Sequence, residues 1–179
     1  VSRSLAACEG ALLVVDAAQG VEAQTVANAF LAIDAGLEII PIMNKIDLPT
    51  ARPDEVDEEL AHTFGFHKRE AIRCSAKTGE GTDEILEAIV TFVPAPAGTR
   101  DIPLRALIFD SHYDEYRGVI VYLCVKEGRL STGQDIILMS SGRKFTVDEV
   151  GYFRPGMVST DVLEAGEGGD FFASIKTIH

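Results

Sequence analysis

The sequence has 179 residues, of which 25% are charged and 46% are hydrophobic. This composition is typical of a folded globular protein and excludes disordered, collagenous and membrane-embedded chains. The 28 acidic residues outnumber the 16 lysines and arginines, and the net charge of −12 excludes the broadly basic surface of a simple nucleic-acid binder. The three widely spaced cysteines indicate neither a disulfide framework nor a zinc site.

Residues 1–93 alternate short apolar runs with segments of helical period, which is typical of βα units around a parallel sheet. Apolar runs predict strands at 11–15 and 37–43, and a weaker third strand at 71–75. Runs that are apolar throughout fit strands covered by helices on both faces of the sheet. We therefore expect an α/β domain in the first half of the chain.

Apolar residues spaced by three or four predict three helices in this half. Pro53 and Gly65 suit the first turn and the end of the second helix, and the Thr82 hydroxyl can cap the third. The expected inner faces, in chain order, are Val26, Phe30 and Ile33; then Val56, Leu60 and Phe64; then Ile85, Leu86, Ile89 and Phe92.

Residues 94–101 contain two prolines and a glycine with little to bury, which predicts a linker. Beyond it the helical period disappears, and strand-like segments follow at 104–109, 119–126, 135–140 and 171–178. Glu127-Gly128 and Ser141-Gly142 are expected tight turns. Short strands at this spacing favour a small closed β-barrel, because closure removes exposed sheet edges. The predicted domains are 1–97 and 98–179.

The strongest chemical signal is N-K-I-D at residues 44–47, directly after the second predicted strand. Ligands of open α/β sheets bind beyond the carboxyl ends of the strands. There, Asp47 can accept two hydrogen bonds from the N1 imino and 2-amino groups of guanine, which adenine does not offer. Asn44 can contact the base edge and neighbouring loops, and the Lys45 stem can cover one face of the ring. The alternative is an ordinary polar turn before Pro49.

A second motif, S-A-K at residues 75–77, follows the third predicted strand. Ser75 can hold the recognition loop by a hydrogen bond, the backbone amide of Ala76 can donate to guanine O6, and Lys77 can cover the other side of the base. Either string alone is weak. Because both end predicted strands and one amphipathic helix separates them, their order predicts a guanine-binding clamp.

These motifs resemble the guanine-recognition motifs of translational GTPases, and D-A-x-x-G-x-x-x-Q-T at residues 16–25 resembles a segment of elongation-factor G domains. Four longer stretches resemble the LepA family, also called elongation factor 4. They are V-S-R-S-L-A-A-C-E-G-A-L-L-V-V-D-A, R-C-S-A-K-T-G, F-D-S-x-Y-D-x-Y-R-G-V and G-Y-F-R-P-G-M-V. The resemblance implies part of a P-loop GTPase G domain, with a parallel sheet and flanking helices, followed by a translation-factor β-barrel.

The resemblance also implies what the full-length protein does. It would bind GTP and GDP with Mg²⁺, hydrolyse GTP to GDP and phosphate on the ribosome, and act as an elongation or fidelity factor, with back-translocation of tRNAs as one form of this activity. Its partners would be rRNA and ribosomal proteins, and tRNA indirectly. It would be cytoplasmic, and peripheral association with the inner face of the cell membrane stays open.

This sequence departs from the family where catalysis would occur. It has no G-K-S or G-K-T string, and its D-x-x-G string, at 148–151, lies within the predicted barrel. In the family, the D-T-P-G-H turn precedes the segment that Val1 opens. We therefore expect a fragment with no catalytic or metal-binding residue of its own, inactive as a GTPase and prone to self-association through an exposed sheet edge.

The sequence leaves two alternatives open. The chain could come from another translational GTPase, of the elongation factor G or BipA/TypA type. It could also be a non-catalytic module that binds RNA or protein and carries a vestigial N-K-I-D loop. A cluster of His112, Tyr113, Tyr116 and Arg117 could clasp ribosomal RNA or could be a packed barrel loop.

Overall fold

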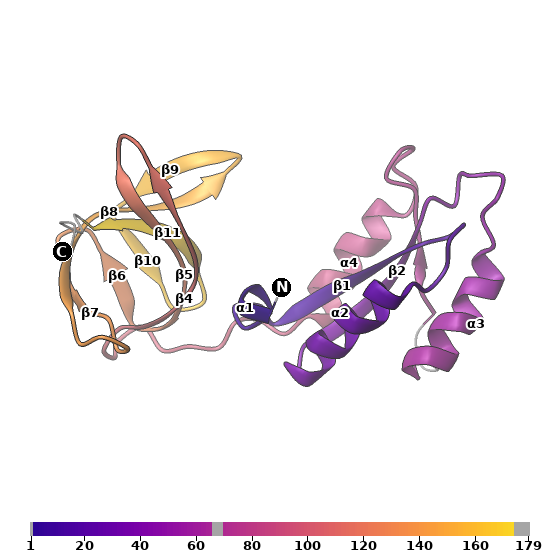
Figure 1. Cartoon of the computed structure of the whole chain (residues 1–179), viewed down its shortest axis with the longest axis horizontal. Helices are drawn as coiled ribbons and strands as arrows, with labels where there is room; N and C mark the ends of the chain where they lie inside the picture. The colour runs from indigo at the N-terminus through magenta and orange to yellow at the C-terminus, as the bar shows by residue number, and fades with distance from the viewer. Residues whose placement is uncertain (1, 66–69, 174–179) are drawn as a thin grey trace. The chain divides into compact units, whose positions relative to one another are not determined.

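The computed structural model describes residues 2–65 and 70–173, and the chain divides into two compact units, Val1–Pro94 and Ala95–His179 (Figure 1). The first unit contains a parallel sheet with helices, and the second consists of antiparallel strands. Within the described residues, no helix is long and apolar enough to cross a membrane.

The sheet of the first unit has the strand order β1-β2-β3, with all neighbours parallel. Its strands are β1 (Gly10–Asp16), β2 (Glu38–Asn44) and β3 (Ile72–Arg73), preceded by the short helix α1 (Ser2–Leu5). The predicted strands are therefore confirmed, and the weak third is short. The register places Asp16 opposite Asn44, so two polar residues meet where β1 and β2 end.

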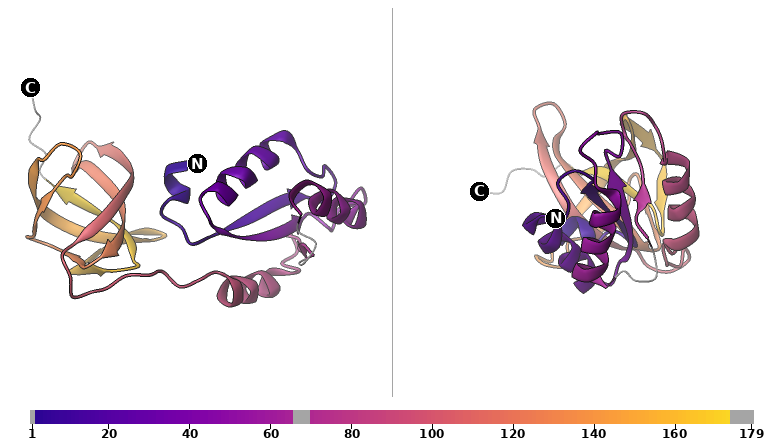
Figure 2. Two further views of the ribbon diagram at one scale, coloured as in Figure 1. Left: turned by 90° about the horizontal axis from the view of Figure 1, so that it is seen from below. Right: turned by 90° about the vertical axis from the view of Figure 1, so that its right-hand side faces the viewer.

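Three longer helices cover this sheet: α2 (Ala23–Asp34), α3 (Pro53–Phe64) and α4 (Thr82–Phe92). Val56 and Leu60 of α3 join Leu13, Val15 and Met43 in one buried cluster, to which Ala29 of α2 also belongs. Ile40 and Ile42 point to the other face and pack against α4. Helices therefore lie on both faces of the sheet, with α4 opposite α2 and α3 (Figure 2).

The predicted inner faces of α2 and α4 are partly wrong. Phe30 and Ile33 are exposed, and Ala29 and Ala32 are the buried residues of α2. In α4 the buried residue is Ala88, whereas Leu86 and Phe92 are exposed. Periodicity identifies an apolar stripe along a helix. It does not show which side of the helix packs against the sheet, because small alanines allow the closest approach of the helix to the sheet.

The expected cap at Thr82 is also wrong. The N-cap of α4 is Gly81, which has a left-handed backbone (φ 76°), and Thr82 is the first helical residue. In α3, by contrast, Pro53 lies in the first turn and Gly65 ends the helix in the left-handed conformation (φ 72°), as predicted.

One face of β1 is incompletely covered. In the register, Leu12 pairs with Ile40 and Val14 pairs with Ile42. These four residues share one face of the sheet, and α4 covers that face over β2. Leu12 is 41% exposed and Val14 is 55% exposed, while Ile40 and Ile42 are buried. Among the described residues, β2 is the strand that pairs with β1, so the opposite edge of β1 is open.

The second unit is an antiparallel half-barrel. A six-stranded sheet follows the order β4-β5-β11-β8-β7, with β9 paired to β8, and a separate two-stranded sheet joins β10 to β6. The strands are β4 (Arg105–Asp114), β5 (Gly118–Glu127), β6 (Arg129–Ser131), β7 (Asp135–Ile137), β8 (Lys144–Arg154), β9 (Gly156–Thr160), β10 (Val162–Glu164) and β11 (Gly168–Ala173). The predicted fold class, α/β followed by an all-β barrel domain, is confirmed.

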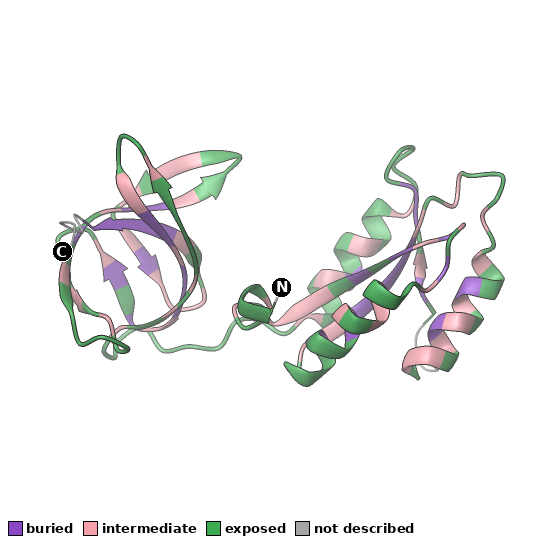
Figure 3. Ribbon diagram, in the orientation of Figure 1, coloured by how far each residue is buried: buried purple, intermediate pink, exposed green. Residues whose placement is uncertain are grey.

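The core of this unit lies inside the curved sheet, and its buried residues come from the neighbouring strands β5, β11 and β8 and from β6 and β10 (Figure 3). The four predicted strands correspond to β4, β5, β7 and β11, although residues 174–178 of the last prediction lie outside the described residues. The longest strand, β8, was missed because Asp148, Glu149 and Gly151 interrupt its apolar pattern. Gly128 and Gly142 have positive φ at the two predicted turns.

Candidate guanine-recognition site

The two predicted recognition motifs lie side by side at the carboxyl ends of β2 and β3. Asn44 is the last residue of β2, and Ser75 to Lys77 follow β3. Backbone hydrogen bonds tie the two segments together, from Cys74 N to the Met43 carbonyl (2.8 Å) and from Ile46 N to the Cys74 carbonyl (3.3 Å). Parallel pairing of β2 and β3 thus brings residues that are distant in the sequence into one cluster.

Asp47 is held from the neighbouring loop. The Ser75 hydroxyl donates to Asp47 Oδ1 (2.7 Å), and Lys77 Nζ lies 3.7 Å from Asp47 Oδ2. The hydrogen bond from Ser75, helped by the charge of Lys77, lowers the pKa of the Asp47 carboxyl below its usual value. Ser75 is buried, and its hydroxyl holds the Asp47 carboxylate in place. Because the pKa of Asp47 is lowered, this carboxylate is ionised at neutral pH.

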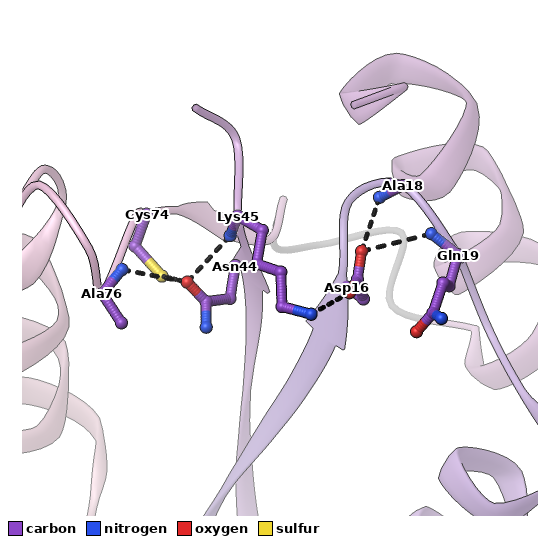
Figure 4. A network of polar contacts seen from close by, with 7 residues as sticks. All are labelled: Asp16, Ala18, Gln19, Asn44, Lys45, Cys74 and Ala76. Atoms are coloured by element: carbon purple, nitrogen blue, oxygen red, sulfur yellow. Dashed lines mark hydrogen bonds and ion pairs between the residues drawn. The ribbon is translucent and has the colours of Figure 1, made fainter. Parts of the chain in front are cut away.

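The Asn44 side chain has its carbonyl oxygen fully engaged. Asn44 Oδ1 accepts hydrogen bonds from Lys45 N (2.8 Å) and Ala76 N (3.0 Å), and a weak one from Cys74 Sγ (3.8 Å; Figure 4). These contacts orient the amide so that its NH₂ group is the part that can reach another molecule. The Ala76 amide, expected to donate to a base, donates here to Asn44.

Lys45 reaches across to the end of β1. Its Nζ lies 2.6 Å from Asp16 Oδ2, and Asp16 Oδ1 accepts the backbone amides of Ala18 (2.8 Å) and Gln19 (3.2 Å; Figure 4). The hydrogen bond between the two side chains lowers the pKa of Asp16 and raises the pKa of Lys45. Asp16 was not among the predicted site residues, although its place at the end of a neighbouring strand was a usable signal.

Glycine shapes the loop that carries Ser75 to Lys77. Ser75 N donates to the Glu80 carbonyl (2.9 Å), and Gly79 N donates back to the Ser75 carbonyl (2.8 Å). Gly81 follows with φ 76°, and a Cβ at this position would collide with the Arg73 carbonyl oxygen. The tight return to α4 therefore requires glycine at 81.

The arrangement offers specific chemistry. At the carboxyl ends of β2 and β3 lie a fixed carboxylate, an oriented amide and two lysine stems. This set of groups suits a flat heterocycle with hydrogen-bond donors along one of its sides. Within residues 2–65 and 70–173, no group of three or more His, Cys, Asp and Glu side chains could hold a metal ion. The hydrogen bonds and ion pairs between the two loops show that all six predicted residues lie together: Asn44, Lys45, Asp47, Ser75, Ala76 and Lys77.

The predicted aromatic and basic cluster of the second unit is not a single contact network. His112 stacks on Tyr122 with ring centroids 5.4 Å apart, and its Nδ1 lies 2.9 Å from the Tyr122 hydroxyl. Arg117 lies over the Phe172 ring, at 5.2 Å from its centroid. Tyr113 and Tyr116 are exposed. Two members of the cluster thus pack on the sheet while the two tyrosines project.

Comparison with known proteins defines the class of the first unit. A family model described as the elongation factor Tu GTP binding domain matches residues 1–95. The chain therefore belongs to this family of GTP-binding domains.

The chain is also a homologue of elongation factor 4. It is 58% identical over 178 residues to elongation factor 4 of Picosynechococcus sp. and 60% identical over 178 residues to elongation factor 4 of Lacticaseibacillus casei. Both alignments cover 99% of this chain but only 30% and 29% of the relatives, so the chain spans about 30% of their length. The predicted resemblance to the LepA family is confirmed.

Solved structures support the same fold. The crystal structure of apo translation elongation factor SelB from Methanococcus maripaludis matches 93% of this chain and 36% of its own, with a TM-score of 0.78 at 21% identity. A bacterial selenocysteine-specific elongation factor matches 96% of this chain and 30% of its own, with a TM-score of 0.77 at 20% identity. At these identities, the likeness shows that the α/β and half-barrel folds are those of translation factors.

Proposed function

We propose that this chain is the base-recognising part of the G domain, residues 1–97, and the second domain, residues 98–179, of a translational GTPase similar to elongation factor 4. The observation that carries the proposal is the joining of the two motifs by the Ser75–Asp47 and Ala76–Asn44 hydrogen bonds. The family match and the identity to elongation factor 4 along 99% of the chain support it.

In this proposal Asp47 selects guanine. Its ionised carboxylate accepts the N1 imino and 2-amino hydrogens of guanine, while Ser75 keeps it in place. The NH₂ group of Asn44 donates to an acceptor on the base, and the stems of Lys45 and Lys77 cover its two faces. The Ala76 amide donates to guanine O6 by sharing or exchanging its bond to Asn44 Oδ1. Adenine would leave the Asp47 carboxylate desolvated and unpaired.

The proposed reaction of the complete protein is hydrolysis of GTP to GDP and phosphate on the ribosome. Through this reaction the protein would act as an elongation or fidelity factor, with back-translocation of tRNAs as one form of this activity. Phosphoryl transfer requires a phosphate-binding loop, Mg²⁺ and a positioned water. The sequence of residues 1–179 contains no G-K-S or G-K-T string. We therefore assign base recognition, and no catalytic step, to these residues, and we expect the 179-residue chain alone to be inactive.

The proposed setting follows from the relatives' name. As an elongation factor 4 homologue, the complete protein would work in the cytoplasm in contact with rRNA and ribosomal proteins, and act on tRNA indirectly. Identity of 58% along nearly the whole chain favours this type over the elongation factor G and BipA/TypA types.

The test is nucleotide competition in the complete natural protein. Labelled GDP should be displaced by GTP and not by ATP, and Asp47→Asn should weaken GDP binding by at least about 100-fold, because a charged acceptor that matches two donors is lost. The side-chain amide that this substitution introduces offers a donor for a 2-carbonyl group, so the variant should bind xanthosine diphosphate better than the natural protein does. Asp101→Asn, which changes an exposed carboxylate of the second unit, is the matched control.

Displacement of the label by ATP and GTP alike would contradict the proposal and favour a non-catalytic module with a vestigial N-K-I-D loop. Unchanged GDP affinity in the Asp47→Asn protein would contradict the assigned role of Asp47.

A further inference from the structure

Lys45 has an unusual backbone. In the ranges 2–65 and 70–173 it is the only non-glycine residue with a positive φ, at 67°. A side chain with a Cβ is disfavoured there, so surrounding contacts must hold the residue in place. The Lys45 amide donates to Asn44 Oδ1 at 2.8 Å, and the lysine ammonium contacts Asp16 at 2.6 Å. Both ends of this residue are therefore fixed.

Asp16 is a rigid partner rather than a mobile surface acid. It ends β1, its side chain is only 16% exposed, and its Oδ1 already accepts the amides of Ala18 and Gln19. The β1–β2 register places it directly opposite Asn44. Its Oδ2 is thus presented at a fixed position, and Lys45 Nζ binds there (Figure 4).

We propose that Asp16 is a positioning residue for the guanine site, because it holds the Lys45 stem extended as one wall of the base-binding slot. This inference rests on the proposed function. A free lysine would lose much side-chain freedom when a base packs on its stem. The ion pair with Asp16 removes that freedom before the base arrives, and it keeps the ammonium away from the face that the base would cover.

This role makes a prediction that differs from that of Asp47. A stacking wall does not read the substituents of the base, whereas Asp47 reads the 2-amino group. In the complete protein, Asp16→Asn should therefore weaken binding of GDP and inosine diphosphate, which lacks that group, by the same factor of about fivefold. Asp47→Asn should weaken GDP more than inosine diphosphate.

A double-mutant cycle shows whether Asp16 acts through Lys45. Lys45→Met keeps an apolar stem and removes the ammonium, so Asp16→Asn should have no further effect in that background. Asp16→Glu keeps a carboxylate and should bind GDP more tightly than Asp16→Asn. Glu55→Gln, which removes the exposed Arg52–Glu55 pair of the same unit, is the control and should bind GDP normally. If Asp16→Asn does not fold, the cycle is run with Asp16→Ser, which removes the carboxylate but keeps a side-chain oxygen that can accept the amides of Ala18 and Gln19.

The outcomes separate the two claims. If the natural protein does not prefer GDP to ADP, the proposed function fails. If it prefers GDP, but the effects of Asp16 and Lys45 are additive, or the Asp16 variant changes the ratio of GDP to inosine diphosphate affinity, the positioning role is overturned. Equal losses for both nucleotides, with full coupling to Lys45, support it.

Discussion

The two units of this chain bury their cores in different ways. The first has a three-stranded parallel sheet with one apolar cluster on each face, and each cluster depends on helices for cover. The second encloses a cluster of nine buried residues between a curved six-stranded antiparallel sheet and the β6–β10 pair. A flat parallel sheet needs cover on both faces and leaves its strand ends open, whereas a curved sheet covers itself.

This difference explains where the polar groups lie. In the first unit, charged residues meet at the strand ends, and each of them has a partner: Asp16 with Lys45, and Asp47 with Ser75 and Lys77. In the second unit, Asp170 lies fully buried on β11, and neither carboxylate oxygen has a hydrogen-bond partner among the described residues. Open strand ends therefore suit a polar binding site, and the sheet wall of the half-barrel does not.

The largest expected effect is on the two cores. Leu60 in α3 and Leu123 in β5 are each 2% exposed and belong to different clusters. Leu60→Ala and Leu123→Ala should each cost about 2–5 kcal/mol, because each leaves a cavity. Hydrogen exchange read by mass spectrometry should show lost protection within the mutated unit. Equal loss across both units for either variant would break the distinction between two separate cores.

The next effect concerns the open edge of β1. Because an unpaired strand edge can pair with another chain, we expect the 179-residue chain to self-associate there. Val14 is 55% exposed on β1, and Ile137 is 58% exposed on β7 at one end of the other sheet. Val14→Lys should weaken self-association about tenfold, since charge on an edge strand opposes pairing. Ile137→Lys is the matched control and should change it little. Sedimentation of the natural chain as a monomer at high concentration would remove the basis for this prediction.

The smallest effect is the opposite pH response of Asp170 and Asp47. Burial, and then the negative charge of Glu149, raise the pKa of Asp170, while Arg117 and His112 oppose that rise. The folded protein therefore binds more protons at Asp170 than the unfolded protein does. The contribution of Asp170 to the free energy of unfolding is full below the ordinary carboxyl pKa, and it falls as the pH rises above about 4. The lowered pKa of Asp47 gives a contribution present at neutral pH and lost as pH falls.

Asp170→Asn should therefore make the stability of the second unit less dependent on pH, with a gain of about 1 kcal/mol at neutral pH relative to the natural residue. Urea unfolding followed at about pH 4, near the ordinary carboxyl pKa, and at about pH 8 measures this. Asp161→Asn, at an exposed position of the same unit, should leave the pH dependence unchanged. A steeper pH dependence in the Asp170 variant would mean that the buried carboxyl is stabilised when ionised.

Much of the candidate site could be predicted because strand ends and motifs are local features. The apolar run before Asn44 and the short run before Ser75 mark the ends of parallel strands, and parallel strand ends share one edge. Asp16 was missed as a partner of Lys45, since that contact depends on the register of β1 against β2. The bond from Ala76 N to Asn44 Oδ1 depends on the path of a loop set by Gly79 and Gly81.

The sequence by itself indicated the order of the three strands and three longer helices of the first unit, a change from an α/β to an all-β unit near residue 98, and the six residues of the candidate site. Periodicity and turn residues act over a few positions, so they can be read along the chain. Only the tertiary structure decided that Ala29 and Ala32 face the sheet in place of Phe30 and Ile33, and that Asp16 holds Lys45. These outcomes depend on which surfaces meet across the fold, and no local pattern contains that information.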